Sequence, residues 1–240
     1  MEPGSVTGAV GTKFHEDGQV RYFPGNSIIA PLEQNRSAFG EIAWAQSVLL
    51  QTPIVSKYAF LPPHSFHMTV FDLLCDQVRD PNHWSTYLST AANLRETDRF
   101  LEDRVARIDP PAAIRLRFVE MSVRRHPSVT VAPATPELAS ELRTYRDRLS
   151  ESTGVRHPGH DAYQYHISLG YLLENLANPD MELAQRTEEK VTERLKVSLA
   201  CFEVPSPSMV YFDHMHAFHR DKTDTIRWSD ESRRRSAQNR

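Results

Sequence analysis

Apolar residues recur at helical spacing in four parts of the chain. The clearest stripe, with a period of about 3.6 residues, lies in residues 136–150, at Leu138, Leu142, Tyr145 and Leu149. Thr135 and Pro136 stand where such a helix would begin and are typical of a helix start. The same spacing predicts further helices over residues 36–51, 81–108 and 179–199.

Shorter runs between these helices read as strands. They are rich in β-branched and aromatic residues, or they alternate apolar with polar positions, and they are bounded by turn residues. We predict strands over residues 27–32, 66–74, 113–123, 128–134, 163–173 and 206–218.

The two halves of the chain repeat the same order of elements: strand, helix, strand, helix, strand. Ala30-Pro31 corresponds to Ala132-Pro133, 102 residues later, and His67 corresponds to His166, 99 residues later. Nearly constant offsets indicate an internal duplication. We therefore expect an α+β fold of two lobes, with two mainly antiparallel sheets facing a central cleft and helices outside, in preference to a doubly wound parallel sheet.

Composition agrees with one globular domain. The chain has 240 residues, 40% of them apolar, and no linker composition separates its halves. We assign residues 13–226 to a single bilobal domain, with lobes over 24–110 and 111–220 that could exchange strands. Residues 1–12 are expected to form a flexible segment, and residues 227–240 a disordered basic tail.

Charge and cysteine content exclude several classes of protein. The net charge of −3 is not that of a polycation for nucleic acid, and Cys75 and Cys201 form neither a disulfide framework nor a metal-ligand spacing. The N-terminus lacks a secretory signal, and no run approaches the roughly 18 apolar residues of a membrane span. We expect a monomer without a membrane partner in the cytoplasm, or in the nucleus if the arginines of the tail act as a targeting signal.

Two predicted strands carry a histidine and a hydroxyl residue at a spacing of two. These are His67 and Thr69 in the first half and His166 and Ser168 in the second. Residues i and i+2 of a strand share a face, and a pseudo-twofold would bring both pairs into one cleft. Two further triplets of this kind lie outside strands, His83-Trp84-Ser85 at an expected helix start and His126-Pro127-Ser128 in a turn.

Such a doubled pair suits phosphodiester chemistry. One imidazole can take a proton from water or a hydroxyl while the other gives a proton to the departing oxygen, because the unperturbed pKa of histidine is about 6.5. Thr69 and Ser168 would donate hydrogen bonds to the non-bridging phosphate oxygens. This scheme needs no metal and no cofactor.

These residues resemble the 2H phosphoesterase superfamily, which includes LigT-like 2′–5′ RNA ligases/phosphodiesterases and the cyclic phosphodiesterases of RNA processing. A poorly characterised branch is similar in "GTKFHEDGQVRYFPGNSIIAPL", "LPPHSFHMTVFD" and "HPGHDAYQYHISLGY", and the resemblance spans residues 11–220. It implies a bilobal fold with the site between the lobes, and metal-independent cleavage of 2′,3′-cyclic or 2′–5′-linked nucleotides or RNA ends. It also implies the catalytic set His67, Thr69, His166 and Ser168.

The resemblance also implies a tyrosine in the site five residues after the second histidine, where this chain has Tyr171. Strict alternation would turn Tyr171 away, but Gly170 could permit a bulge that re-aims it, and the first half has Asp72 at the matching place. Tyr163 and Asn26 are further candidates for contacting substrate, although a strand tyrosine usually packs and Asn26 can serve only to shape a turn.

Two other functions stay open at this point. The first is a catalytically silent nucleotide- or RNA-binding module on the same fold. The second is a metal-dependent hydrolase that uses His157, His160 and Asp161, although no zinc-protease motif or paired cysteines accompany that cluster. Arg115 and Arg117 are interpreted as the outer face of an edge strand in preference to a phosphate contact.

Overall fold

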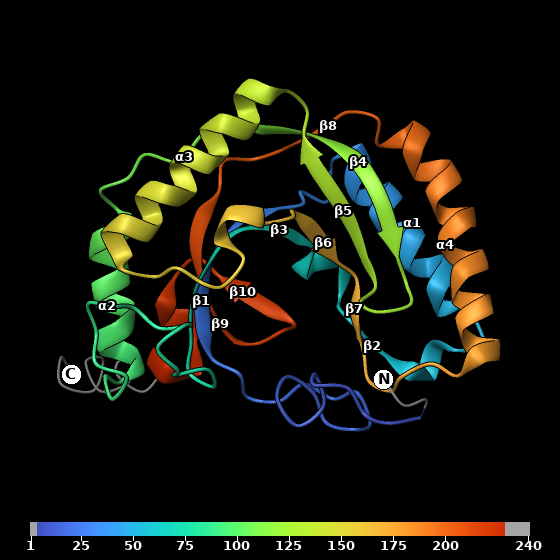
Figure 1. Ribbon diagram of the computed structural model, residues 1–240, viewed down its shortest axis with the longest axis horizontal. Coiled ribbons are helices and arrows are strands. Elements are labelled where there is room, and N and C mark those ends of the chain that lie inside the picture. Colours follow the sequence, from blue (N-terminus) through green and yellow to red (C-terminus); the bar gives the residue numbers. More distant parts are fainter. Residues whose placement is uncertain (1–3, 229–240) are drawn as a thin grey trace, which may run out of the picture.

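A curled antiparallel sheet carries helices on its outer side (Figure 1). The structure is a computed structural model that describes residues 4–228, and within them eight strands run in the order β10-β9-β1-β3-β6-β5-β4-β8. The strands are β1 Gly25–Pro31, β3 His67–Cys75, β4 Ile114–Ser122, β5 Ser128–Pro133, β6 His166–Ser168, β8 Phe202–Val204, β9 Ser208–His214 and β10 Ala217–His219. A second, two-stranded sheet joins β2 (Tyr58–Phe60) to β7 (Gly170–Leu172).

The α-helices pack in two pairs on either side of the sheet (Figure 1). They are α1 Ser37–Leu50, α2 Leu94–Val105, α3 Pro136–Thr153 and α4 Asn178–Ser198, with α1 against α4 and α2 against α3. Short 3-10 helices lie at Val55–Lys57, Pro63–Ser65, His160–Ala162 and Lys222–Asp224. As its sequence predicts, α3 is capped by the Thr135 side chain, and it ends at Gly154, whose φ of 70° is left-handed.

The topology exchanges strands between the two halves of the chain. β4, from the first half, pairs with β5 of the second, and β9, from the second half, pairs with β1 of the first. The half-sheets meet where β3 pairs with β6 through Met68 and Ile167, both of which are fully buried. The expected α+β fold is confirmed. The two main sheets expected from the sequence are joined into one, because β3 pairs with β6 between them.

Three predicted elements differ from the structure. The helix expected over 81–108 is helical only from Leu94, because Asn93 and Glu96 form a capping box that starts α2 there. The apolar residues upstream lie in turns, with Trp84 buried under the guanidinium of Arg79. The strand expected over 163–173 is divided between β6 and β7, and the strand expected over 206–218 is divided between β9 and β10. The short strands β2 and β8 were not predicted, because three residues are too few for alternation to reveal.

Both ends of the described chain pack on the fold. Residues 4–12, where the sequence suggests flexibility, run beside residues 173–175 through the backbone bonds Gly4 N to Asn175 O and Thr7 N to Leu173 O, each 2.9 Å. Arg227 was expected to open a disordered tail, yet Arg227 and Trp228 are buried. The rest of that predicted tail lies outside the described residues. Among residues 4–228, no helix has the length and apolar character needed to cross a membrane.

Candidate active site

A cavity of about 590 Å³ lies over the junction of β3 and β6. It is lined by every side chain that the sequence proposed for the site: Asn26, His67, Thr69, Tyr163, His166, Ser168 and Tyr171. The pseudo-twofold arrangement of the halves therefore brings the two His-hydroxyl pairs to one place.

The two histidines are held in the same way. His67 Nδ1 lies 2.7 Å from the carbonyl oxygen of Ser65, and His166 Nδ1 lies 3.2 Å from that of Gln164, in each case two residues earlier. A carbonyl oxygen can only accept a hydrogen bond, so Nδ1 carries the proton in both rings. Nε2 of each ring is left to exchange a proton with a bound phosphodiester.

The first histidine strand is bulged just after its hydroxyl residue. Consecutive residues of β1 pair with Thr69 and Phe71, so Val70 is the extra residue of the bulge. A bulge shifts the alternation by one residue. Asp72 therefore lines the same cavity as His67 and Thr69.

The second histidine strand breaks at the equivalent position. The chain leaves β6 at Ser168 and enters β7 at Gly170, so Leu169 is the break between the two sheets. Residue 170 has no room for a side chain, because a Cβ there would lie 2.8 Å from the carbonyl oxygen of Ala59. The break returns Tyr171 to the cavity, where the family resemblance implies a tyrosine.

Two functional candidates in the cavity escaped the sequence reasoning. His126, dismissed as a turn residue, places Nε2 2.9 Å from Ser168 Oγ, and its ring lies against that of His166 with centroids 5.8 Å apart. Lys13 is the one Lys or Arg that the described residues contribute to the lining, with Nζ 3.4 Å from the Tyr171 hydroxyl. The signal for His126 was its His-x-Ser triplet, and Lys13 lies in one of the phrases that carry the family resemblance.

Burial keeps two of the histidines neutral. It lowers the pKa of His67 to about 4, and the nearby His166 lowers it further, against the opposing effect of the Ser65 carbonyl. Burial also lowers the pKa of His126 to about 4, with His166 and Lys13 acting in the same direction. At neutral pH both rings are therefore ready to accept a proton.

The remaining sequence candidates form walls of the cavity. Tyr163 donates from its hydroxyl to the Thr69 carbonyl oxygen at 3.4 Å, and the Arg146 guanidinium lies 4.0 Å from its ring centroid. Asn26 is buried, and both ends of its amide are engaged, Nδ2 with Asp98 at 2.9 Å and Oδ1 with the Leu74 amide at 3.0 Å. These two contacts use both ends of the amide, so Asn26 holds the wall of the cavity in position.

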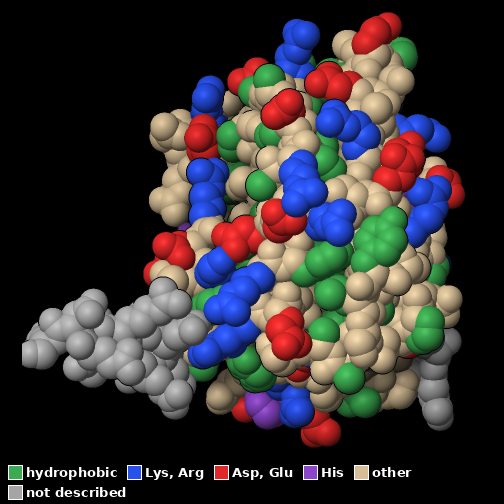
Figure 2. Space-filling view, turned by 90° about the vertical axis from the view of Figure 1, so that its left-hand side faces the viewer, with side chains coloured by type: hydrophobic (Ala, Val, Ile, Leu, Met, Phe, Trp, Pro, Cys, Tyr) green, Lys and Arg blue, Asp and Glu red, His purple; other side chains and the backbone are tan. Residues whose placement is uncertain are grey.

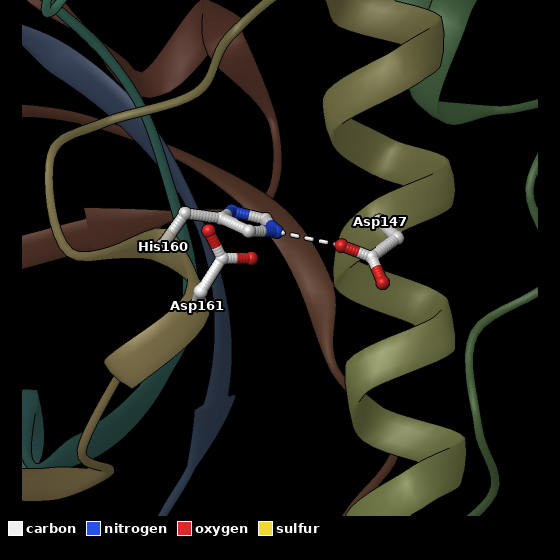
Figure 3. Close-up of side chains that lie close together, drawn as sticks. All are labelled: Asp147, His160 and Asp161. Carbon is white, nitrogen blue, oxygen red and sulfur yellow. Dashed lines mark hydrogen bonds and ion pairs between the residues drawn. The ribbon is translucent and has the colours of Figure 1, made fainter.

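The cluster that suggested a metal site is divided by the fold. His157 lines the cavity and bonds the Leu73 carbonyl through Nε2 at 2.8 Å. His160 and Asp161 turn instead toward Asp147 of α3 (Figure 3), and these three side chains could together hold a cation. Arg156 already pairs with Asp161 at 2.6 Å, however, so the negative charge of the cluster is offset by a guanidinium.

Comparison with known proteins finds a family model that matches part of the chain. Residues 13–126 match the family model described as 2H-phosphodiest, a domain of unknown function (DUF1868). The resemblance to this branch of the 2H phosphoesterases is confirmed. The matched part contains the first His-hydroxyl pair, together with Lys13 and His126, whereas the second pair of the 2H pattern lies beyond it.

A solved structure shows the same fold as this chain. A conserved protein of unknown function from Agrobacterium tumefaciens str. C58 superposes with a TM-score of 0.84 at 24% identity, covering 90% of this chain and 91% of that one. A second structure, described as a phosphoesterase, has a TM-score of 0.45 at 12% identity over 81% of this chain and 93% of its own. Comparison with curated proteins gave no match.

Proposed function

We propose that this protein hydrolyses a phosphodiester, either a 2′,3′-cyclic phosphate or a 2′–5′-linked nucleotide or RNA end, by acid–base catalysis without a metal ion. The observation that carries the proposal is the pair of histidines anchored alike through Nδ1 on one cavity, each beside a hydroxyl residue. The match to a model named for 2H phosphodiesterases supports the same chemistry.

His67 acts as the general base in this mechanism. Burial lowers its pKa to about 4, so Nε2 is free at neutral pH to take a proton from water as the water oxygen bonds to phosphorus. His166 acts as the general acid in its imidazolium form, which keeps the Nδ1 proton on the Gln164 carbonyl and gives a second proton, on Nε2, to the ester oxygen as the phosphorus–oxygen bond breaks. A cyclic phosphate thereby yields a phosphate monoester and a free hydroxyl.

Charge that develops on the non-bridging oxygens meets donors from both halves of the chain. The hydroxyls of Thr69 and Ser168 donate to these oxygens, and the Lys13 ammonium supplies a positive charge at the same cavity. In this arrangement His126 donates from Nε2 to Ser168 Oγ, 2.9 Å away, and so orients the hydroxyl and leaves its single proton for the phosphate. Each of these groups belongs to the chain itself.

Hydrolysis of 2′,3′-cyclic mononucleotides and 2′–5′ dinucleotides in EDTA tests the proposal. We expect turnover by wild type and by His15→Ala, an exposed histidine outside the cavity, and a loss of at least about 10²-fold in His67→Ala and in His166→Ala. If wild type binds nucleotides but forms no product, the protein is a catalytically silent binding module and the proposed hydrolysis is wrong. Turnover that disappears in EDTA and returns with a divalent cation would favour a metal-dependent hydrolase.

A further inference from the structure

A second hollow adjoins the candidate active site. It has a volume of about 370 Å³, lies between α3 and the strands β4 and β5, and shares Tyr163 with the catalytic cavity. Thr130 lines it and is the register partner of His166 across β5 and β6. Two residues on, Ala132 pairs with Arg117 of β4, so Arg117 stands about two strand spacings, about 10 Å, to the side of His166.

Two uncommitted arginines face this hollow. Arg117 of β4 and Arg143 of α3 both line it, both are exposed, and neither makes a hydrogen bond or ion pair within residues 4–228. The outer surface over α2 and α3 carries Lys and Arg interspersed with Asp and Glu (Figure 2), so a pair of unpaired guanidiniums in a hollow differs from the general surface. The interpretation of Arg115 and Arg117 as the outer face of an edge strand is wrong, because β4 lies between β5 and β8 and Arg117 lines the hollow.

The other charged groups of the hollow are already engaged. Buried Arg146 donates to the carbonyls of Val70 and His160, at 2.5 and 3.1 Å. Asp147 bonds the His160 ring at 2.9 Å, and Asp161 pairs with Arg156. Arg156 also lies 3.7 Å from Asp147, and Arg143 acts electrostatically on the same carboxylate. Arginines outnumber carboxylates in the lining, so the hollow keeps positive charge that can attract an anion.

An aromatic surface lies between the two arginines and the catalytic cavity. Tyr163 and Tyr165 meet edge to face, with centroids 5.4 Å apart, and both line the hollow. Tyr165 is half-buried, so part of its ring is open. Aromatic side chains beside unpaired cations are the combination that binds single-stranded nucleotides, the ring stacking on a base and the cation contacting a phosphate.

We propose that the hollow is a subsite for the nucleotide next to the scissile phosphate. This arginine subsite consists of Arg117, Arg143, Tyr163 and Tyr165. The proposal rests on the proposed function, because it places that phosphate at His67 and His166. The substrate is then the end of an oligonucleotide, and a mononucleotide fills only half of the available site. Phosphate contact by a guanidinium gives affinity without base specificity.

Kinetics with short and long substrates test the arginine subsite. The substrates are a 2′,3′-cyclic mononucleotide and a trinucleotide that ends in the same cyclic phosphate. The variants are Arg117→Gln and Arg143→Gln, with Arg148→Gln as the control, since Arg148 is an exposed arginine of α3 outside the hollow. We expect each subsite variant to lose about tenfold in kcat/KM on the trinucleotide, mainly through KM, and less than about twofold on the mononucleotide.

Salt dependence and direct binding complete the test. The slope of log affinity against log salt for the trinucleotide should fall by about 0.7 for each arginine removed. In an active enzyme, the arginine subsite would be overturned if its variants lost kcat/KM equally on both substrates. It would also be overturned if they lost no kcat/KM on the trinucleotide. If no substrate is turned over, anisotropy with a labelled trinucleotide 3′-phosphate decides: a Kd raised only in the two subsite variants supports the subsite, and an unchanged Kd overturns it.

Discussion

Gln46 and Arg146 stand 100 residues apart at corresponding places in the two halves, and each holds the histidine strand of the other half. Gln46, on α1, donates from Nε2 to the carbonyl oxygen of Leu169 at 2.8 Å. Arg146, on α3, donates from Nη1 to that of Val70 at 2.5 Å. Val70 and Leu169 are the residues at which alternation breaks, so a helix of each half fixes the register of the other half's histidine strand.

The first prediction follows from the burial of these two side chains. Gln46→Leu leaves buried carbonyls without their donor and should lower the free energy of unfolding by about 1–3 kcal/mol. Arg146→Met should cost at least as much, because Arg146 also donates to the His160 carbonyl at 3.1 Å. Urea unfolding measures both, and Arg148→Met, an exposed residue of the same helix, should stay within about 0.5 kcal/mol of wild type. Equal stability of all four proteins would show that these bonds do not hold the bulges.

The second prediction concerns acid stability. Burial lowers the pKa of His67 and of His126 to about 4, whereas the pKa of an unfolded histidine is about 6.5. Between these values the unfolded chain binds more protons than the folded one, so stability is present above about pH 6.5 and falls as pH drops toward 4. Urea midpoints at pH 7, 5.5 and 4.5 should decline in wild type.

A matched variant isolates the two histidines in that decline. The double variant His67→Gln and His126→Gln should lose less stability between pH 6.5 and 4 than wild type, since two acid-sensitive groups are gone. His15→Gln, exposed and outside the cavity, should keep the wild-type slope. A double variant with the wild-type slope would show that neither ring is held neutral by its surroundings.

Much of the fold could be predicted from the sequence, because the spacing of apolar residues within each long helix or strand shows which face is buried. The stripe of α3 and the alternation of β4 each report burial on one face, and the repeated order of elements reports the duplication. The first His-hydroxyl pair of the candidate site was visible for the same reason, since His67 and Thr69 share a strand face. A three-residue strand such as β2 carries too few positions to show a period, so it was missed.

The remaining site residues depend on contacts between distant segments. Lys13 reaches the cavity because residues 4–12 run beside residues 173–175, and no local pattern encodes that path. His126 joins the site through Ser168, 42 residues away, although His-Pro-Ser alone indicates only a turn. The extra residue Val70 is set by pairing with another strand. Such features depend on tertiary contacts that periodicity does not report.

The third prediction is that His126 orients the Ser168 hydroxyl. His126→Ala should lower kcat about tenfold on any cleaved substrate, with little change in KM, because the hydroxyl loses the partner that aims it at the developing charge. His126→Gln offers a polar group at a similar distance and should recover part of the loss. A purely structural role would instead lower stability in both variants and leave kcat unchanged for the folded fraction.

The fourth prediction concerns the cation of the cavity. Lys13→Met should lower kcat/KM by about 10–10²-fold, since an ammonium that offsets phosphate charge is removed from a partly buried site. Lys13→Arg should retain most of the activity, because it restores the charge. Arg21→Gln, a nearby cation outside the cavity, serves as the control and should match wild type. Full activity in Lys13→Met would exclude Lys13 from the chemistry.

The last prediction concerns the buried ion pair that supports the cavity wall from behind. Asp98 is fully buried and accepts from Arg227 Nε at 2.8 Å and from Trp228 Nε1 at 2.7 Å. Asn26 Nδ2 also donates to Asp98, and Asn26 Oδ1 accepts from the amide of Leu74. A bonded path therefore runs from the C-terminal end of the described chain to the lining of the cavity.

Removing one partner should leave an uncompensated charge in the interior. Arg227→Met is expected to lower the free energy of unfolding by about 3–5 kcal/mol, measured in urea. Adding Asp98→Leu to that variant should restore part of the loss, because the unpaired carboxylate is gone, although Asn26 then loses its acceptor. A double variant no more stable than the single one, with Asp98→Leu alone harmless, would show that Arg227 acts through its bonds to the carbonyls of Phe212 and Gly25 and not through the ion pair.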